Sequence, residues 1–408
     1  MKATAPKRIA LLVESSHGTG RDIVHGVAAF LREQGCDWLV DHETQRLEGS
    51  PPAWLAKWRG DGVIARLHSE RVAKAVSRLR VPVVDVLNAL PPAPAVHQAH
   101  VDEAAIARLA FEHLRSLGLR QFAFCGPTDR VWAWQRRDVF TAAATEANMP
   151  VHVYEFSRHL RTQELASRRA ERLVKWLRTL PRPIGVLAAN DSYAWLVSTA
   201  CRLAGLAVPA DVAILGVDND EVFCSLARPP LSSIVTATGR LGFEAARMMD
   251  AILNERDAGK RRHIMVPPLG VKVRASTDTL ATDDEDVTAA VQLIRGLGSE
   301  KLSVTAIAEA VGLSVSTLQR RFRATVGHSV HEESIRHRLR NAMRLLSETD
   351  LSILAVAHRA GFGHQEYLGR VFRSRLGVTP ADYRKSALSR SVETLNQFRG
   401  QTPTPQHD

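Results

Sequence analysis

The stretch IAEAVGLSVSTLQRRFRATVG, Ile307–Gly327, recurs along the chain as VAHRAGFGHQEYLGRVFRSRLG, Val356–Gly377. The glycines Gly312 and Gly361 are 49 positions apart, and after one inserted residue the matching leucines, arginines and phenylalanines are 50 positions apart. Each copy has the pattern of two short helices joined by a turn that contains glycine, which is typical of a helix-turn-helix. Two copies are too few for a solenoid. This end of the chain therefore predicts a small all-helical domain with two helix-turn-helix units.

The apolar residues of the repeat support this interpretation, because they recur at helical spacing and give each copy a small core. The first core consists of Ile307, Ala308, Val311, Leu313, Leu318 and Phe322, and the second of Val356, Ala357, Phe362, Leu368 and Phe372. A third apolar set, Ile335, Leu339, Ala342, Met343 and Leu346, lies between the copies and predicts a connecting helix.

Positive charge is concentrated in the same region. The whole chain of 408 residues has a formal net charge of +11. Residues 287–386 contain 15 lysines and arginines against 8 acidic residues, a net +7, whereas residues 1–286 contain 37 against 33, a net +4. A basic segment of this kind is the electrostatic signature of nucleic-acid binding, although a solvated basic face would give the same count.

The second helix of a helix-turn-helix enters the major groove of DNA, and residues near its N-terminus contact the bases. Arginine can bond guanine, glutamine can bond adenine, and glutamate can accept from cytosine. In this sequence the candidates for base contacts are Ser316, Thr317, Gln319 and Arg320 in the first copy and Gln365, Glu366 and Arg370 in the second. Arg321, Arg323 and Arg373 follow on the same helices and are candidates for phosphate contacts.

The segment Leu302–Arg384 resembles the AraC/XylS family of transcription activators. The stretch ILAVAHRAGFGHQEYLGRVFRSRLGVTPADYR, Ile353–Arg384, carries the resemblance through its AGF turn, the aromatic Tyr367, the Phe-Arg pair and the closing G-x-T-P-x-x-Y-R. Gly369 departs from a good recognition helix, because a glycine inside a helix costs up to about 1 kcal/mol. The resemblance implies DNA binding through both units and, for an activator, contact with RNA polymerase.

Residues 7–275 have a different pattern, in which apolar runs alternate with amphipathic segments. This alternation predicts parallel sheets covered by helices on both faces, and its length suits two lobes. The expected strands are 8–13, 62–65, 81–86, 121–125, 151–154, 184–188, 212–217 and 264–267, and the expected helices are 21–34, 102–117, 134–147, 161–180, 191–204 and 239–255. HGTGRD, after the first strand, is neither a Walker loop nor GxGxxG, so we do not expect a nucleotide there.

The domain boundaries follow from these patterns. We expect a first lobe at approximately 7–117 and 231–255 and a second lobe at approximately 118–230 and 260–275. The polar, acidic segment 276–286 predicts a linker, residues 287–386 form the helical domain, and 387–408 is expected to be a disordered tail.

The α/β region resembles the effector domain of the LacI/GalR repressors, which has the two-lobed, type I fold of periplasmic sugar-binding proteins. The resemblance rests on the order of four short motifs. They are RRDVF (Arg136–Phe140), LAANDSYAW (Leu187–Trp195), AVPADVAILGVDNDE (Ala207–Glu221) and PPLSSI (Pro229–Ile234). An effector domain of this type followed by an AraC-type domain is the arrangement of xylose operon activators. The resemblance therefore implies a sugar ligand, D-xylose first of all, and a homodimer.

A sugar site needs groups that pair with hydroxyls and a flat face for the ring. Asp218, Asp191 and Asn190 are the candidates for hydroxyl pairing, Arg136 for donation and Trp132 for stacking, with Glu14 and Arg21 as candidates from the opposite lobe. Three alternatives stay open at this point. Asp191 could only cap its helix, Trp132 could pack at a hinge, and Trp134 could replace it as the stacking residue.

Other classes of function find little support. No GxSxG, HExxH or Walker motif is present, so we expect no catalytic residue and no enzyme activity. The cysteines Cys36, Cys125, Cys201 and Cys224 lack metal-binding spacing, and the histidine pairs HQAH and HSVH have no acidic or cysteine cluster beside them. We expect no metal, no cofactor, no membrane span and no signal peptide, and therefore a cytoplasmic protein.

The sequence therefore predicts a sugar-responsive, DNA-binding transcription activator. One alternative is an activator that responds to another pentose or to a hexose. Another, of a different class, is a sugar-binding protein whose helical domain contacts protein instead of DNA. The residues alone support only a small polyhydroxylated ligand.

Overall fold

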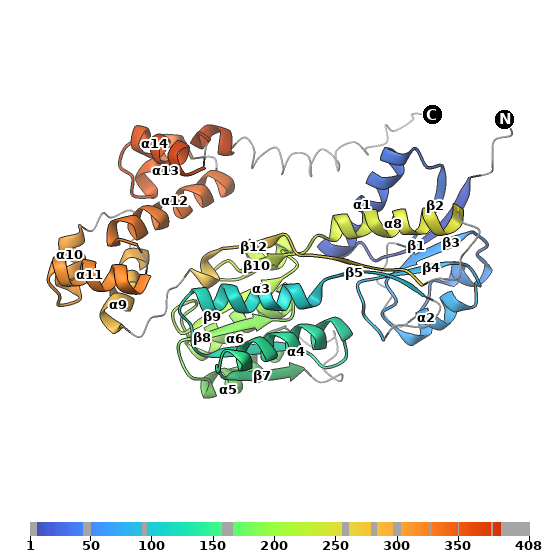
Figure 1. Cartoon of the computed structure of the whole chain (residues 1–408), viewed down its shortest axis with the longest axis horizontal. Coiled ribbons are helices and arrows are strands. Elements are labelled where there is room, and N and C mark those ends of the chain that lie inside the picture. Colours follow the sequence, from blue (N-terminus) through green and yellow to red (C-terminus); the bar gives the residue numbers. More distant parts are fainter. Residues whose placement is uncertain are drawn as a thin grey trace, which may run out of the picture. The chain divides into compact units, whose positions relative to one another are not determined.

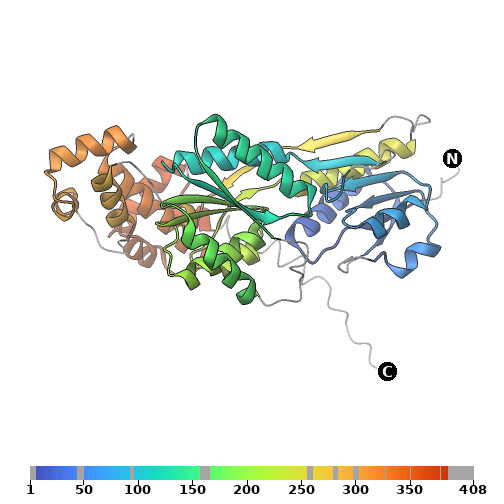
Figure 2. The ribbon, with the colours of Figure 1, turned by 90° about the horizontal axis from the view of Figure 1, so that it is seen from below.

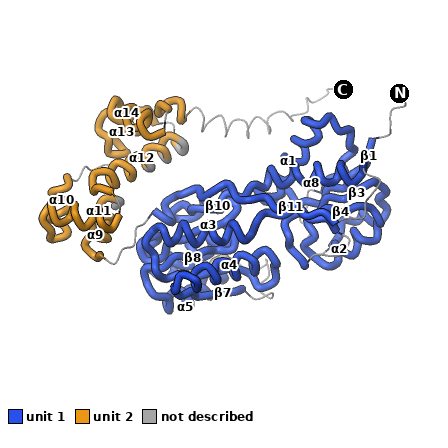
Figure 3. The backbone as a smooth tube through the Cα atoms, viewed as in Figure 1, with its two compact units in different colours: residues 1–279 blue, residues 280–408 orange. Residues whose placement is uncertain are grey.

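The structure is a computed structural model. It describes residues 6–43, 50–91, 96–156, 166–254, 261–278, 284–296, 303–326, 328–349, 351–376 and 378–384. These residues belong to two compact units, residues 1–279 and residues 280–408 (Figures 1 and 3). The expected tail, 387–408, lies outside the described residues.

The first unit contains two sheets, and the first of them forms the centre of lobe 1. Its strand order is β11-β5-β4-β3-β1-β2, and all of its strand pairs are parallel. The strands are β1 (Lys7–Leu12), β2 (Trp38–His42), β3 (Gly62–Ala65), β4 (Val83–Val86), β5 (His97–Val101) and β11 (His263–Val266). The helices of this lobe are α1 (Gly18–Gln34), α2 (Glu70–Ser77), α8 (Thr238–Asn254) and the short 3₁₀ helix Ala53–Lys57.

The second sheet forms the centre of lobe 2, with the order β12-β10-β9-β8-β6-β7 and a single antiparallel pair, β10 with β12. Its strands are β6 (Phe122–Pro127), β7 (Val151–Phe156), β8 (Ile184–Ala188), β9 (Val212–Val217), β10 (Ser232–Val235) and β12 (Gly270–Lys272). Helices α3 (Glu103–Ser116) and α4 (Val131–Glu146) cover one face, and α5 (Ala166–Thr179) and α6 (Asp191–Ala204) the other (Figure 2). The short helix α7 (Glu221–Leu226) follows β9, and a 3₁₀ turn, Ala275–Thr277, ends the lobe.

All eight expected strands and all six expected helices of this unit are confirmed, three of the strands and one helix with the same bounds. The start of the helix expected at 161–180 lies outside the described residues. Four strands were not predicted, β2, β5, β10 and β12. Strands β5 and β10 have polar sequences, HQAHV and SSIV, yet His97, Gln98, His100, Ser232 and Ser233 are all buried.

The predicted lobe boundaries differ from the structure at three elements. Helix α3 packs on α4 in lobe 2, β10 lies in the second sheet, and β11 lies in the first sheet. The chain therefore crosses between the lobes after β5, after β10 and after β11. Hydrogen bonds join these crossings, from the backbone N–H of Asp102 to Val266 O at 2.8 Å and from that of Leu269 to Val235 O at 2.9 Å. Sequence patterning marks strands but not the sheet to which each belongs, which explains the error.

Glycines allow close approach where α1 packs along α8 in lobe 1 (Figure 1). A Cβ atom on Gly26 would lie 1.9 Å from the carbonyl oxygen of Gly239, and one on Gly242 would lie 2.1 Å from that of Ile23. Gly20 has a similar role, because its Cβ atom would lie 1.8 Å from the carbonyl oxygen of Glu14. Gly26 and Gly242 thus allow α1 to pack against α8, and Gly20 allows the start of α1 to lie close to the loop after β1.

The second unit consists of six helices among its described residues, and the repeat forms two helix-turn-helix motifs as predicted. The helices are α9 (Glu285–Gly296), α10 (Val304–Ala310), α11 (Val315–Val326), α12 (Val330–Glu348), α13 (Ile353–Arg359) and α14 (Gln365–Leu376). Gly312 and Gly361, in the turns, have φ values of 69° and 80°, a conformation that glycine adopts easily. Helices α9 to α11 share one apolar core, and α12 to α14 share another.

The end of the first unit is more ordered than the linker prediction implies. Ser276 and Thr277, at the start of the predicted linker, are buried. Ser276 Oγ donates to Ile214 O at 2.6 Å and accepts from the backbone N–H of Ser232 at 2.8 Å. Residues 279–283 lie outside the described part of the chain, and α9 begins at Glu285.

Candidate functional site

Charged side chains from both lobes gather where the parallel strands end. In lobe 2, Asp218 follows β9, and Asn190 and Asp191 follow β8. In lobe 1, Glu14 follows β1 and Arg66 follows β3. Ligands of α/β proteins bind at the carboxyl ends of parallel strands, so this charged cluster is the candidate ligand site.

Arg136 of α4 is the most constrained member of the cluster, with 3% of its surface exposed. Its Nε donates to the carboxylate of Glu103, at the start of α3, and its Nη1 donates to the carbonyl oxygen of Ala189. Its Nη2 lies 4.0 Å from Oδ1 of Asp218. Two sides of the guanidinium are therefore fixed by the protein, and the third is directed toward Asp218.

The charge state of this pair follows from burial and mutual attraction. Burial raises the pKa of Glu103 to about 7, even though Arg136 acts in the opposite direction. Burial also works against the charged form of Arg136, but Glu103 and Asp218 outweigh it and raise the pKa of the guanidinium. Arg136 therefore stays protonated and remains a hydrogen-bond donor.

The carboxylate of Asp218 has few hydrogen-bond partners among the described residues for a group at a charged, half-buried site. Its backbone has φ 100°, in the region that disfavours residues with side chains, and its N–H donates to Ile234 O at 2.9 Å. The side chain is 22% exposed and has Thr236 Oγ1 at 3.5 Å from Oδ1. Burial raises the pKa of the carboxyl group. Strained backbone of this kind is concentrated at functional sites.

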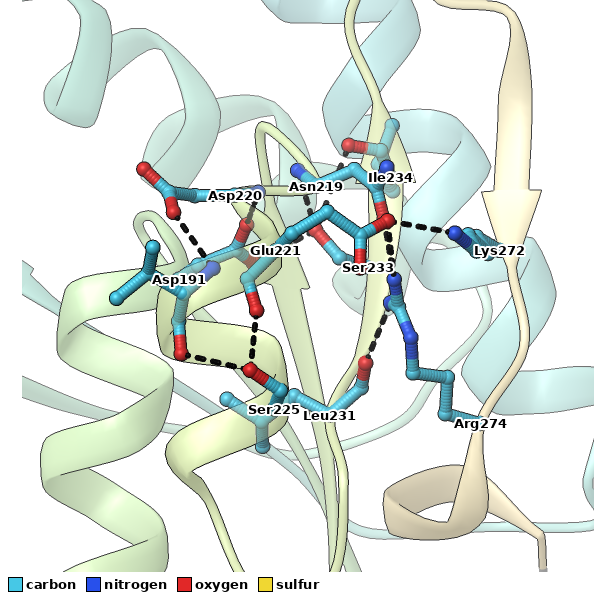
Figure 4. Close-up of polar contacts among 11 residues, drawn as sticks. Asp191, Asn219, Asp220, Glu221, Ser225, Leu231, Ser233, Ile234, Lys272 and Arg274 are labelled. Atoms are coloured by element: carbon cyan, nitrogen blue, oxygen red, sulfur yellow. Dashed lines mark hydrogen bonds and ion pairs between the residues drawn. The ribbon is translucent and has the colours of Figure 1, made fainter. Parts of the chain in front are cut away.

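Asp191 is placed differently, because lobe 2 occupies both of its carboxylate oxygens. Figure 4 shows Oδ2 accepting from the backbone N–H of Asp220, at 2.6 Å, and Oδ1 accepting from Ser233 Oγ, also at 2.6 Å. Gly216 on β9 leaves room for it, since a Cβ atom there would lie 2.0 Å from Oδ1. The N-cap of α6 is Asn190, whose side chain accepts from the N–H of Tyr193 at 3.2 Å. Asp191 thus connects three strand ends instead of capping the helix.

Arg274, near the end of the lobe, supports the loop that carries Asp218. Its Nη2 donates to Asn219 Oδ1 at 2.7 Å and its Nη1 to Leu231 O at 2.8 Å (Figure 4). Glu221, at the start of α7, accepts from Arg274 at 3.4 Å and from Lys272 at 2.7 Å. Arg274 was not predicted as a site residue, because 55 positions separate it from Asn219 in the loop that it holds.

The two candidate tryptophans have distinct surroundings. The guanidinium of Arg136 lies over the ring of Trp132, 5.0 Å from the centroid. Trp132 is 9% exposed, and no described residue accepts from its buried Nε1. Trp134 donates through Nε1 to Thr128 O at 2.7 Å and so fastens the loop after β6. The structure brings Trp132, and not Trp134, into contact with the charged cluster.

In lobe 1 the structure separates the two predicted candidates. Glu14 Oε1 lies 3.4 Å from Nη1 of Arg66. Arg21 instead donates through Nη1 to the carbonyl oxygens of Ser15 and Ser16, at 3.1 and 3.2 Å, and supports its own loop. Arg66 is therefore the lobe 1 guanidinium beside Glu14, and it was not predicted because no motif surrounds it.

The lobes touch each other beside this cluster. The backbone N–H of Gly18 in lobe 1 donates to Oδ2 of Asp220 in lobe 2 at 3.4 Å. Asn88, after β4, donates to Oε1 of Gln135 on α4 at 2.9 Å. A change in the separation of the lobes would alter both contacts.

The helices expected to read DNA expose most of the expected residues. On α11 and α14 the exposed candidates are Ser316, Gln319, Arg320, Arg323, Gln365, Glu366, Arg370 and Arg373, and Thr317 is half-buried. Ser314 begins α11 by accepting from the N–H of Thr317 at 3.2 Å, and its hydroxyl also donates to Thr317 Oγ1 at 2.9 Å. The hydroxyl of Thr317 is thus partly engaged by the helix cap.

Arg321 does not match its expected role as a phosphate contact. Its Nε and Nη2 donate to both carboxylate oxygens of Asp284, at 2.7 and 2.6 Å, and its Nη1 lies 2.9 Å from Asp286. The two acids lie at the start of α9, which packs beside α11, so the guanidinium joins these helices. Both acids lie within the predicted linker, 276–286, so this pairing could not be predicted from the sequence.

Three further observations concern metals, membranes and cysteines. In the described ranges, no group of three or more potential metal-binding side chains occurs. No helix in the described part of the chain is long and apolar enough to span a bilayer. Cys125, Cys201 and Cys224 are buried, and Cys36 is half-buried.

Comparison with known families matches each part of the chain separately. The sequence profile of the XylR N-terminal domain matches residues 8–96. The profile of the periplasmic binding protein-like domain matches residues 111–277, and that of a helix-turn-helix domain matches residues 307–386.

Full-length relatives have the same order of parts. The xylose operon regulatory protein of Escherichia coli (strain K12) is 31% identical over 391 residues, which cover 93% of this chain and 97% of the relative. The protein of the same name from Haemophilus influenzae is 27% identical, over 92% of this chain and 98% of the relative. A solved structure of the xylose-binding transcription activator XylR is 30% identical and covers 94% of this chain and 99% of its own, with a TM-score of 0.71. The regulator CelR in complex with cellobiose, 24% identical with a TM-score of 0.53 over 66% of this chain and 84% of its own, shares the fold of the first unit.

Proposed function

Because this chain belongs to the family of xylose operon regulatory proteins, we propose that it activates transcription when D-xylose binds between its two lobes. The observation that carries the proposal is the agreement of both units, in one order, with relatives named for xylose regulation. The relatives are transcription regulators, and the chain is accordingly a regulator and not an enzyme.

The charged cluster has the chemistry that a neutral sugar requires. Asp218 can accept from two hydroxyls, and the third side of the Arg136 guanidinium faces the same place at 4.0 Å. We assign hydroxyl contacts to Asp218, Arg136, Asn190 and Glu14. We assign the apolar face to Trp132, whose indole N–H is also available as a donor.

Asp191 and Arg21 receive a different assignment in this proposal. Both carboxylate oxygens of Asp191 and the Nη1 group of Arg21 already have partners in their own lobe. They therefore hold the loops that carry the binding residues and do not contact the sugar.

Sugar binding can control DNA binding only if the sugar prefers one arrangement of the lobes over another. Residues from both lobes reach the cluster, and contacts such as Asn88–Gln135 join the lobes beside it. A ligand held from both sides would favour the arrangement in which both sides reach it. We propose that this preference is transmitted to the helical unit.

For the helical unit we propose binding to two successive major-groove segments through α11 and α14. The exposed Arg320 and Arg370, at equivalent places in the two copies, would contact bases, and Arg323 and Arg373 would contact phosphates. We also propose a homodimer, contact with RNA polymerase and a cytoplasmic location, as expected for an activator of this class.

Titration calorimetry on the full chain tests the sugar. D-xylose should bind more tightly than L-arabinose or D-ribose. It should also bind more tightly than D-glucose, which shares its hydroxyl pattern but adds a hydroxymethyl group at C5. Asp218→Ala and Arg136→Ala should each raise the dissociation constant about tenfold or more, since buried hydrogen-bond partners are worth about 1–3 kcal/mol. Asp138→Ala, on the exposed face of α4, is the matched control and should bind as the wild type does. Tighter binding of another sugar would refute the xylose assignment and leave the regulator assignment intact.

A further inference from the structure

Arg66 occupies a position at the site that neither the sequence motifs nor the assigned residues explain. Its backbone N–H donates to Leu12 O at 3.0 Å, which fixes it at the carboxyl end of β3, beside β1. The side chain is 22% exposed. Its Nη1 donates to Glu14 Oε1 at 3.4 Å. Its Nε is buried, and no residue in the described part of the chain accepts a hydrogen bond from it.

A guanidinium has five N–H donors in a planar fork. Burying such donors without acceptors is costly, so proteins pair them where they can. Burial lowers the pKa of Arg66, and the neighbouring carboxylates of Glu14, Asp218 and Asp85 do not offset this effect. Arg66 is therefore a guanidinium of lobe 1 whose buried Nε has no acceptor among the described residues and whose charge is attracted by Asp218 of lobe 2.

We propose that Arg66 is a sugar-binding residue of lobe 1, which donates to hydroxyl oxygens of the same sugar that Asp218 and Arg136 hold from lobe 2. This inference rests on the proposed function and extends it to a residue outside every motif of the sequence. It gives the site an arginine from each lobe. A sugar bound by both arginines ties the lobes together, so Arg66 also contributes to the preference for one lobe arrangement.

A purely structural role would consist of neutralising Glu14. The two roles predict different results, because a structural arginine affects folding and affects all ligands equally. A binding arginine contacts particular hydroxyls, and its removal changes how the site discriminates among sugars that lack one hydroxyl each.

The test is titration calorimetry of the full-length protein with D-xylose and with its monodeoxy analogues. Arg66→Met keeps the length of the side chain and removes the donors, and Arg66→Lys keeps the charge without the planar fork. We expect the dissociation constant for D-xylose to rise about tenfold or more in Arg66→Met and less in Arg66→Lys. In the wild type, a monodeoxy analogue that lacks the hydroxyl contacted by Arg66 should have a higher dissociation constant than D-xylose. In Arg66→Met this difference between the two sugars should largely disappear. Arg71→Met, on the exposed surface of α2, is the control and should behave as the wild type does.

The outcomes are distinguishable. If the wild type binds D-xylose and Arg66→Met binds it within about twofold, with the same penalties for every analogue, the proposal for Arg66 is overturned and the proposed function stands. If Arg66→Met does not fold, as judged by its thermal unfolding, Arg66→Lys decides through the analogues: the same penalty as the wild type for every monodeoxy analogue overturns the proposal, and a changed penalty for one of them supports it. A wild-type chain that binds no sugar of the panel overturns both proposals.

Discussion

Replacing Asp191 with asparagine separates the two roles open to this carboxyl group, a sugar contact and a brace inside lobe 2. In the structure Oδ1 accepts from Ser233 Oγ and Oδ2 from the backbone N–H of Asp220. In Asp191→Asn the amide oxygen can still accept from Asp220. The amide N–H₂ can donate to Ser233 Oγ, because a hydroxyl can turn from donor to acceptor. The brace should therefore survive the substitution.

The size of the effect follows from the pKa of Asp191. Burial, with the nearby charge of Asp218 as the next contribution, raises this pKa from 3.8 to about 8. The difference is about four units, and each unit corresponds to about 1.4 kcal/mol. Ionising the folded protein at this site would thus cost up to about 6 kcal/mol, which relaxation and water entry reduce to several kcal/mol.

The sign follows from proton linkage. The folded state keeps the proton of Asp191 up to about pH 8, whereas the unfolded chain loses it near pH 4. The stabilisation from this group is therefore fully present below about pH 4 and is lost as the pH rises toward 8. Asparagine resembles the protonated acid at every pH. The free energy of unfolding of Asp191→Asn, minus that of the wild type, should rise by about 1 kcal/mol per pH unit between pH 5 and pH 8 and then level off.

Urea denaturation of both proteins across this pH range measures that difference, and titration calorimetry measures the sugar. We expect the dissociation constant for D-xylose to stay within about threefold of the wild-type value in Asp191→Asn. A difference in stability that is flat between pH 5 and pH 8 would refute the buried, protonated state. A tenfold loss of sugar affinity in a folded variant would show that Asp191 contacts the ligand.

Three further predictions concern the helical unit. Arg320→Ala and Arg370→Ala should each weaken operator binding by about 1–3 kcal/mol and relax the preference at one base pair, whereas Arg323→Ala should weaken all sequences alike; binding assays on mutated operators at several salt concentrations decide between these outcomes. Arg321→Ala should lower the thermal midpoint of the helical unit, because it removes the ion pair that joins α9 to α11, and it should leave the salt dependence of DNA binding unchanged. A weaker salt dependence in the variant would support a phosphate contact by Arg321. Gly369→Ala should stabilise α14 by about 1 kcal/mol, since no atom of the described residues lies within 4 Å of the added Cβ; a lower thermal midpoint would contradict this.

The elements that the sequence predicted well have strong apolar patterns or a clear repeat. Strands such as Ile184–Ala188 are apolar throughout, and the helix-turn-helix pattern occurs twice in the repeat. The missed strands β5 and β10 bury histidine, glutamine and serine, which hydropathy assigns to the surface. Several of their polar groups have partners far along the chain, as Ser232 has in Ser276. Patterns in a short window cannot reveal such partners.

The candidate site divides in the same way. Asp218, Arg136 and Asn190 belong to motifs and were found. Glu103, Arg66 and Arg274 were not found, because each acts through a residue more than thirty positions away. Asp191 was predicted as a site residue, but its partners Asp220 and Ser233 were not predicted, since they depend on the meeting of strand ends from β8, β9 and β10.

The three crossings between the lobes also set the order in which the first unit can be completed during synthesis. Strand β11, an edge of the first sheet, pairs His263 with Gln98, and α8 covers α1 through contacts that leave no room for a Cβ atom. Both elements leave the ribosome only after most of lobe 2 has emerged. Until then lobe 1 has an open sheet edge and an uncovered helix, the features that expose a nascent chain to misassembly. A fragment that ends before α8 should therefore aggregate, and a soluble version of the first unit must extend through residue 278.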